Sequence, residues 1–340
     1  MDISIIICTY NSATRISETL EHLKKQHLEE SILWEILIVD YDSTDETISI
    51  CNKYAKELNV PLKIINELQP GKSSALVTGF EQSTGKYLCI VDDDNWVANN
   101  YISIAFKIMS SHTNIGMIGG YGTPFLGAEK PDWFDSFAGV FAVGHQIEKA
   151  GFTSIGERNW FWGAASIIRK EAWDKIKMRG FSFILNPSRD GSSMFKKGFA
   201  GGEDQELCFA VQLCGYKLWY EPSLCYTHYI SSNRLTVNYL YKTILGTSKA
   251  TPVIKLYQSL LIKKTLKGRI KKLLYTSIPL IFLHDFYILL VGIIQGFSSP
   301  YKKIIWYTSF IRFRSSCSGL FMLKGKLKMV LKDITKLQEN

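Results

Sequence analysis

The sequence has no CxxC pair and no regular spacing among its seven cysteines. This absence argues against a disulfide framework and favours a reduced, cytosolic chain whose thiols lie in the core. No charged leader with a cleavage site follows Met1, so we expect no secretory signal. Internal repeats and low-complexity segments are absent too, and 340 residues suffice for one large domain or two smaller ones.

Acidic and basic residues are spread unevenly along the chain. Residues 1–254 contain 24 Lys and Arg against 28 Asp and Glu, whereas residues 255–340 contain 16 against 3. The formal net charge of +9 therefore arises in the C-terminal tail. A nucleic-acid surface is not favoured, because no recognition motif accompanies this charge.

Short apolar runs in the first hundred residues predict four β-strands, over 3–9, 35–40, 61–66 and 87–92. The amphipathic stretches between them predict helices, the first capped by Asn11 or Ser12 and running to about Gln26. Strands this uniformly apolar are covered on both faces. The predicted fold class is α/β, with a mostly parallel sheet sandwiched by helices.

A polar cluster follows each predicted strand, in the order CTYN, DYDSTD, ELQPGK and DDDN. In open α/β sheets, ligands bind at the carboxyl ends of the strands. We therefore expect the four clusters to meet at one edge of the sheet and to form a binding site there.

The last cluster contains three successive carboxylates, Asp92, Asp93 and Asp94. Like charges this close raise each other's pKa unless a cation or solvent neutralises them. Mg²⁺ or Mn²⁺ would do so, because these ions prefer one or two carboxylates together with phosphate oxygens and water. The alternative is a solvated acidic turn that caps the following helix.

A second acidic pair, Glu203 and Asp204, follows two glycines and opens a segment with helical apolar spacing. One of these carboxylates could serve as a general base held on a rigid element, or both could simply complement the helix dipole. His228 follows two short strands predicted around Pro222. It is either a packed, hydrogen-bonded residue or, if the fold brings it to Asp94, a metal ligand.

Taken together, these residues resemble the family 2 inverting glycosyltransferases, which have the GT-A, Rossmann-like nucleotide-sugar-binding fold. The resemblance covers about residues 2–230. It rests on seven elements in the family's order, namely SIIICTYN, IVDYDSTDET, GKSSAL, GKYLCIVDDDN, WGAASIIRKEAW, GGEDQEL and HY. It implies a role in bacterial surface-glycan biosynthesis.

The resemblance implies a donor site for a nucleotide-sugar, expected to be a UDP-sugar. Thr9, Tyr10 and Asn11 would shape the nucleotide pocket, and Asp40 would recognise the base. Lys72 would lie near the diphosphate.

The acidic run would continue this site. Asp92 and Asp93 would hold the ribose and the diphosphate. Asp94 would be the principal ligand of Mn²⁺ or Mg²⁺, and His228 is the candidate second ligand.

The acceptor half of the site would lie at the second acidic pair. Asp204 would be the catalytic base that deprotonates an acceptor hydroxyl, and Glu203 beside it would shape the acceptor site. Trp160 and Trp162 would either stack on sugar faces or belong to the core.

The chain departs from the family pattern at three places. Tyr41 and Val77 stand where family members often carry Asp or Asn, and the QxxRW element of processive synthases is missing. We therefore expect one sugar to be added to a hydroxyl of a glycan or lipid-linked saccharide. The alternatives are a nucleotidyltransferase acting on sugar phosphates and a non-catalytic carbohydrate-binding protein of the same fold.

The tail contains an apolar stretch over 273–297 that Pro279, His284 and Asp285 interrupt. A central Asp makes it a poor membrane span. Because lysines, arginines and aromatic residues flank it, we expect helices that lie on an anionic membrane surface. The alternative is a helical subdomain packed on the catalytic core or in an oligomer interface.

The predicted organisation is a GT-A catalytic domain over 1–235 and a helical, membrane-associating extension over 236–340. The predicted location is the cytoplasmic, inner face of the cell membrane. Homo-oligomerisation stays open.

Overall fold

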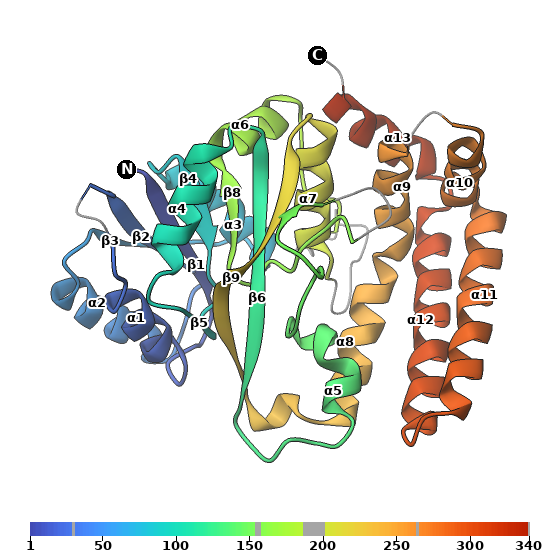
Figure 1. The fold of residues 1–340 in the computed structure, drawn as a ribbon, viewed down its shortest axis with the longest axis horizontal. Helices are drawn as coiled ribbons and strands as arrows, with labels where there is room; N and C mark the ends of the chain where they lie inside the picture. Colours follow the sequence, from blue (N-terminus) through green and yellow to red (C-terminus); the bar gives the residue numbers. More distant parts are fainter. Residues whose placement is uncertain (29–30, 154–157, 186–200, 263–264, 339–340) are drawn as a thin grey trace.

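The structure is a computed structural model that describes residues 1–28, 31–153, 158–185, 201–262 and 265–338. Its centre is a nine-stranded sheet with the strand order β3-β2-β1-β4-β8-β6-β9-β5, and β7 pairs with β9 (Figure 1). The strands are β1 Ile3–Thr9, β2 Trp34–Asp40, β3 Leu62–Asn66, β4 Tyr87–Ile90, β5 Asn95–Val97, β6 Ile115–Leu126, β7 Gly151–Phe152, β8 Ser166–Arg169 and β9 Lys217–Ile230.

The first four strands form a parallel unit with helices on both faces. Their side chains alternate between two apolar layers, since Ile5 and Ile7 belong to one core cluster and Ile6 to the other. Helices α1 Ile16–Lys24, α2 Thr47–Glu57 and α4 Tyr101–Ser111 cover one face. Helices α3 Lys72–Gln82, α6 Lys170–Met178 and α7 Glu203–Leu213 cover the other. The predicted α/β sandwich is confirmed.

The second half of the sheet is mixed, because β8 runs antiparallel to β4 and β6 lies parallel to β9. The prediction of two short strands around Pro222 is wrong, since β9 is one 14-residue strand. The pairing with β6 shifts register between Gly119 and Tyr121, which face Tyr220 and Cys225. This irregularity leaves Pro222, which has no N–H to donate, outside the ladder while the strand continues.

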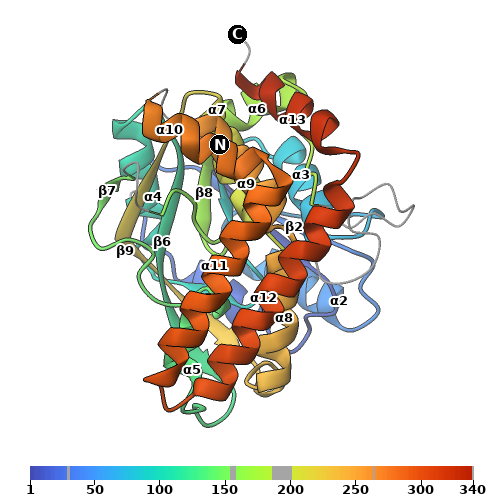
Figure 2. The same ribbon diagram turned by 90° about the vertical axis from the view of Figure 1, so that its right-hand side faces the viewer.

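The chain after the sheet is helical, with α5 Phe134–Phe137 lying earlier, in the loop after β6 (Figures 1 and 2). The C-terminal helices are α8 Val237–Lys249, α9 Thr251–Leu261, α10 Leu266–Thr276, α11 Ile278–Phe297, α12 Lys302–Leu323 and α13 Leu327–Thr335. Val253 and Tyr257 of α9 and Ile334 of α13 are buried in the same cluster as Phe209 of α7. A division at residue 235 therefore separates sheet from helices but not one core from another, and the division stays a prediction.

Helices α11 and α12 lie on the side of the molecule away from β1 to β3 (Figure 1). Among the described helices, α11 alone is long and apolar enough to cross a membrane, with a mean hydropathy of 1.9 and 11% of the window buried. Its one carboxylate, Asp285, is buried and bonds inward, to Lys255 of α9 and to Ser316 Oγ of α12 at 2.7 Å. Large apolar side chains of α11 remain exposed, namely Phe282, Leu283, Phe286, Tyr287, Ile288, Leu290, Ile294 and Phe297.

Candidate active site

The loops after β1 and β2 are tied together at the carboxyl edge of the sheet. Asn11 has a positive φ of 45°, its backbone N–H donates to Ser43 Oγ at 2.9 Å, and its Oδ1 accepts from Thr44 N at 2.9 Å. Asp40 is buried and accepts hydrogen bonds from the backbone and hydroxyl of Ser43. Tyr10 is 52% exposed beside these loops. Tyr10, Asn11 and Asp40 thus lie at the carboxyl edge of the sheet, and a nucleotide pocket formed by them stays a prediction.

Asp93 is buried where β1 and the loop after β4 meet. Thr9 Oγ1 donates to its Oδ2 at 2.9 Å, and Arg15 forms a two-pronged ion pair with it at 2.8 and 2.9 Å. Burial raises the pKa of Asp93, and the bonds from Arg15 only partly offset this. Thr9 and Asp93 therefore lie together, and Arg15 balances the carboxylate.

Asp92 pairs with the ammonium group of Lys72, at the first residue of α3. Both side chains line a cavity of about 690 Å³ that also contains Glu203, Asp204 and His228. The predicted neighbours of the donor diphosphate therefore open into the same space as the predicted acceptor residues.

Asp94 faces His228 and Arg234. Arg234 NH1 donates to Asp94 Oδ2 at 2.8 Å, and His228 Nε2 lies 3.4 Å from the same oxygen. β5 and β9 create this contact, because Asn95, the residue after Asp94, pairs with His228 in the sheet. Burial alone would raise the pKa of Asp94, but His228 and Arg234 hold it below its usual range.

The pair of Asp94 and His228 fits a divalent ion. His228 Nδ1 lies 2.6 Å from the carbonyl oxygen of Phe141, which can only accept, so Nδ1 carries a proton. In the neutral ring the lone pair is then on Nε2, which lies 3.4 Å from Arg234 NH1. This is the arrangement of metal-binding histidines, which donate their other N–H to a carbonyl or carboxylate. Within the described ranges no three His, Cys, Asp or Glu side chains cluster as metal ligands. Phosphate oxygens and water would have to complete the coordination.

Crowding of the three carboxylates Asp92, Asp93 and Asp94 does not indicate a metal ion, contrary to the expectation from the sequence. The three acidic side chains do not require a divalent ion for charge balance, because each already has a basic partner. Asp92 pairs with Lys72, Asp93 with Arg15 and Asp94 with Arg234. The metal-binding interpretation therefore rests on Asp94 and His228, and not on repulsion within the acidic run.

Asp204 lies in the first turn of α7, after Gly202, whose φ of 111° favours glycine. Its carboxylate accepts hydrogen bonds from the N–H of Gln205 at 2.8 Å and of Gly163 at 3.3 Å. Burial, followed by the neighbouring charge of Glu203, raises the pKa of Asp204 to about 7. A general base for an alcohol works best with a pKa near the operating pH.

Gly163 lies between the two halves of the site. A Cβ at this position would lie 3.4 Å from Asp204 Cβ and 4.0 Å from Lys72 Nζ. The carboxylate predicted to activate the acceptor and the ammonium predicted to meet the diphosphate are thus separated by little more than one backbone segment.

Trp160 and Trp162 line the cavity, and Arg158 covers both of them. Its guanidinium carbon lies 3.7 Å and 4.4 Å from their ring centres. Burial lowers the pKa of Arg158 to about 10, although Asp204 opposes the shift. The ring faces under Arg158 are occupied, so stacking of a sugar on them stays a prediction for the remaining faces.

Sequence reasoning missed three arginines of this site, Arg15, Arg158 and Arg234. No motif marks them, since each reaches its partner through the fold. A weak signal exists for two of them, because Arg15 follows CTYN within one turn and Arg234 stands six residues after His228.

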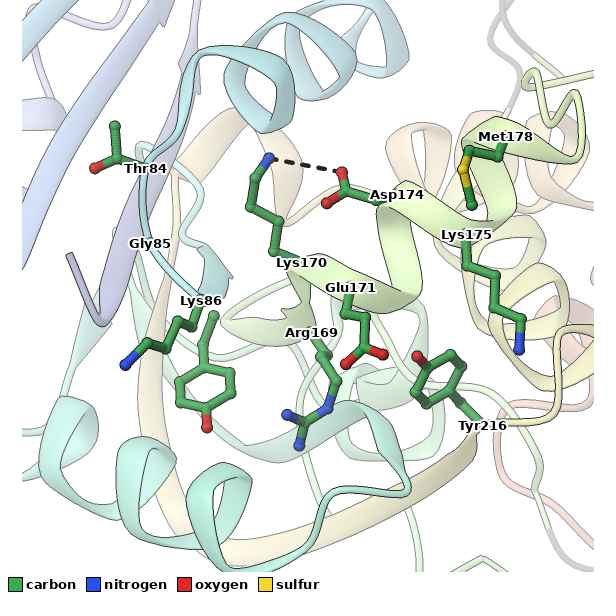
Figure 3. A pocket seen from close by; sticks show the side chains of 11 residues that line it. Thr84, Gly85, Lys86, Arg169, Lys170, Glu171, Asp174, Lys175, Met178 and Tyr216 are labelled. Carbon is green, nitrogen blue, oxygen red and sulfur yellow. Dashed lines mark ion pairs between the residues drawn. The ribbon is translucent and has the colours of Figure 1, made fainter.

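A cavity of similar size, about 650 Å³, lies at the opposite edge of the sheet, where β4 begins (Figure 3). Several of its charged side chains have partners within the fold. Lys170 Nζ lies 3.7 Å from Asp174, and Arg169 donates to the carbonyl oxygens of Ile115 and Met109. This cavity contains none of the predicted catalytic or binding residues.

Comparison with known proteins places the chain in a family. The profile of "Glycosyl transferase family 2" matches residues 4–176. Poly(ribitol-phosphate) beta-N-acetylglucosaminyltransferase TarS of Staphylococcus aureus is 30% identical over 112 residues, 33% of this chain and 19% of TarS. The putative glycosyltransferase EpsH of Bacillus subtilis is 28% identical over 113 residues, 33% of this chain and 32% of EpsH. The matches thus span less than two thirds of these relatives.

Solved structures agree on the fold. S. aureus TarS 1–349 in complex with UDP-GlcNAc superposes with a TM-score of 0.52 at 16% identity, over 96% of this chain and 92% of that one. Mannosyltransferase PcManGT from Pyrobaculum calidifontis, in complex with GDP-Man and Mn²⁺, gives 0.55 at 17% identity, over 94% and 87%. Since the family profile covers just over half of the 340 residues, this chain belongs to glycosyl transferase family 2 and is a glycosyltransferase with the GT-A fold.

Proposed function

We propose that the enzyme transfers one sugar from a nucleotide-diphosphate sugar to a hydroxyl group of a glycan or lipid-linked saccharide, with inversion at the anomeric carbon. The observation that carries this proposal is the meeting of Asp204 with Lys72 at Gly163, in one cavity. In this transfer the acceptor hydroxyl attacks the anomeric carbon that the diphosphate leaves, so the groups that bind the two must lie close together.

In the donor half, the loops of Thr9, Tyr10 and Asn11 would hold the nucleotide, and Asp40 would accept from the base. The ammonium group of Lys72 has several N–H donors, so it could bond to the diphosphate as well as to Asp92. UDP is the proposed nucleotide, supported by the TarS complex with UDP-GlcNAc, whereas the bound donor of PcManGT is GDP-Man.

Asp94 and His228 would hold Mn²⁺ or Mg²⁺, and PcManGT binds Mn²⁺. Such an ion, when bound, supplies Lewis-acid stabilisation of the charge that develops on a leaving diphosphate. Arg234, which now contacts Asp94, provides a second positive group at the same place.

In the acceptor half, Asp204 would take the proton of the attacking hydroxyl. Its raised pKa makes it a stronger base than an exposed carboxylate, and the N–H of Gly163 fixes one of its oxygens. Glu203 lines the same cavity and would contribute to the acceptor site.

The C-terminal helices would bring the enzyme to the cytoplasmic face of a membrane, where lipid-linked acceptors are presented. The exposed apolar side chains of α11 and the excess of lysine and arginine after residue 255 support this. Residues 1–235 would then carry the catalysis and residues 236–340 the attachment.

The test is a screen for nucleoside-diphosphate release from several nucleotide-sugars, with and without Mn²⁺ or Mg²⁺. Asp204→Asn should retain donor binding and lose transfer. Asp174→Asn, an equivalent change at an exposed helix position, should keep transfer. Near-normal turnover of Asp204→Asn would refute the role of the base. Release of pyrophosphate instead would indicate a nucleotidyltransferase, and no product from any donor would favour a carbohydrate-binding protein.

A further inference from the structure

A second cavity, of about 560 Å³, adjoins the active-site cavity and lies among α9, α11 and α12. Five residues line both cavities, namely Ser136, Phe137, Ser248, Thr251 and Arg312. These residues therefore form a wall that both cavities share, with Asp204 lining the first cavity and residues of α11 lining the second.

Arg312 has no ion-pair or hydrogen-bond partner within the part of the chain that the structure describes. Arg15 and Arg234, in contrast, bond to Asp93 and Asp94. The side chain of Arg312 is exposed on the wall of both cavities, so its guanidinium group is open to solvent and to a ligand. A guanidinium group on a concave wall without a counter-charge is suited to an anionic ligand.

The other charges on the walls of the second cavity are already matched. Asp285 is buried, is paired with Lys255 and accepts from Ser316 Oγ at 2.7 Å. This leaves Arg312 as a cation without a described partner at the junction. Much of the remaining wall is apolar and comes from Ile288, Leu289, Val291, Gly292, Ile305 and Phe313.

We propose that Arg312 binds a phosphate group of the acceptor, with the acceptor hydroxyl directed toward Asp204 and the far side of the phosphate toward the second cavity. This proposal rests on the proposed transfer function. A guanidinium group can donate two parallel hydrogen bonds to phosphate. A lipid-linked phosphate and a phosphodiester of a water-soluble polymer offer the same chemistry, but only the lipid also offers a chain for the apolar wall.

The experiment measures binding by calorimetry to the full-length protein. The probes are decyl phosphate below its micelle concentration, decyl glucoside, which has the same chain without the phosphate, and glycerol phosphate. The variants are Arg312→Ala, Arg312→Lys and, as the matched control, Arg314→Ala. Arg314 lies on the same helix and is exposed like Arg312, but it lines neither cavity.

We expect Arg312→Ala to weaken decyl phosphate binding by about 10- to 100-fold, the effect of losing a charge-assisted contact. Arg312→Lys should be intermediate, Arg314→Ala should match the wild type, and the melting temperatures should be equal. Much weaker binding of glycerol phosphate would identify a lipid source, and equal Arg312-dependent binding of both phosphates would identify a water-soluble one.

Unchanged decyl phosphate affinity in Arg312→Ala would overturn the proposal. So would equal affinity for decyl glucoside, or displacement of decyl phosphate by UDP, since UDP belongs in the donor half. Nucleoside-diphosphate release in the absence of acceptor tests the proposed transfer function separately from phosphate binding. Release by Arg312→Ala at the wild-type rate shows that transfer chemistry is intact, whereas release by no variant tells against the proposed function and leaves the phosphate result standing.

Discussion

Replacement of Glu203 by Gln tests the electrostatics of the proposed base directly. Burial raises the pKa of Asp204 to about 7 from a usual value of 3.8, and the charge of Glu203 is the next largest cause. Below this pKa the base is protonated and cannot accept the acceptor proton, so kcat/KM should fall tenfold per pH unit. Removal of the neighbouring charge should make Asp204 ionise more easily. The acidic limb of the pH profile, where kcat/KM falls as the base is protonated, should then move to lower pH.

The magnitude follows from Coulomb's law. The whole shift, about 3 pKa units, corresponds to about 4 kcal/mol. Side chains on adjacent residues lie within about 10 Å, where two charges interact by about 1.7 kcal/mol at an effective dielectric constant of about 20. Solvent in the open cavity reduces this value. We therefore expect Glu203→Gln to lower the pKa of Asp204 by about one unit, to about 6.

The assay is the pH profile of kcat/KM between pH 5 and 9, with saturating Mn²⁺ and the donor identified by the screen, because this ratio reports ionisations of the free enzyme. The control is Glu171→Gln, an exposed carboxylate beside the cavity of Figure 3, which should leave the limb in place. An acidic limb that stays near pH 7 in Glu203→Gln, or that moves upward, would refute the reasoning.

Three further predictions concern stability and attachment. Burial raises the pKa of Glu206 to about 8 from 4.5, so the folded state binds a proton that the unfolded state releases. The free energy of unfolding should therefore fall from pH 5 to pH 8. Glu206→Gln should flatten this decline in urea titrations. Trp173→Ala, at a fully buried core position, should lower the free energy of unfolding by about 3 to 5 kcal/mol in denaturant titration. The double change Ile294→Ser and Phe297→Ser, at residues 68% and 70% exposed, should weaken binding to anionic vesicles at least about tenfold in sedimentation, whereas Met178→Ser should not.

The parallel half of the sheet was predictable because its signals are local. An apolar run such as 35–40 fixes a strand within one residue of β2, and the polar residues that follow it lie at the expected edge. The first helix was less well predicted, since it begins at Ile16 and not after Asn11 or Ser12. The side chain of Asn11 instead accepts from Thr44 N in the loop after β2, and the Ser12 hydroxyl bonds to that of Thr9, which sequence spacing cannot show.

The rest depends on contacts between distant segments. Arg234 reaches Asp94 across 140 positions, and α9 enters the main core where its Tyr257 contacts Phe209 of α7. The composition of the tail predicts either helices on a membrane surface or a subdomain packed on the catalytic domain, and residues of α9 and α13 do lie in the main core. Its amphipathic spacing could not indicate which apolar face meets the catalytic domain and which stays exposed.

The three acid and base pairs along the strand edge give the site a nearly balanced charge before any substrate arrives. An incoming diphosphate must then detach a basic side chain from its carboxylate or arrive with a cation of its own. Binding becomes an exchange of partners, in which the net electrostatic attraction is small and discrimination depends on geometry. Free phosphate should gain little from binding beside these three pairs, and donor affinity should vary only weakly with ionic strength, unlike that of an open basic patch.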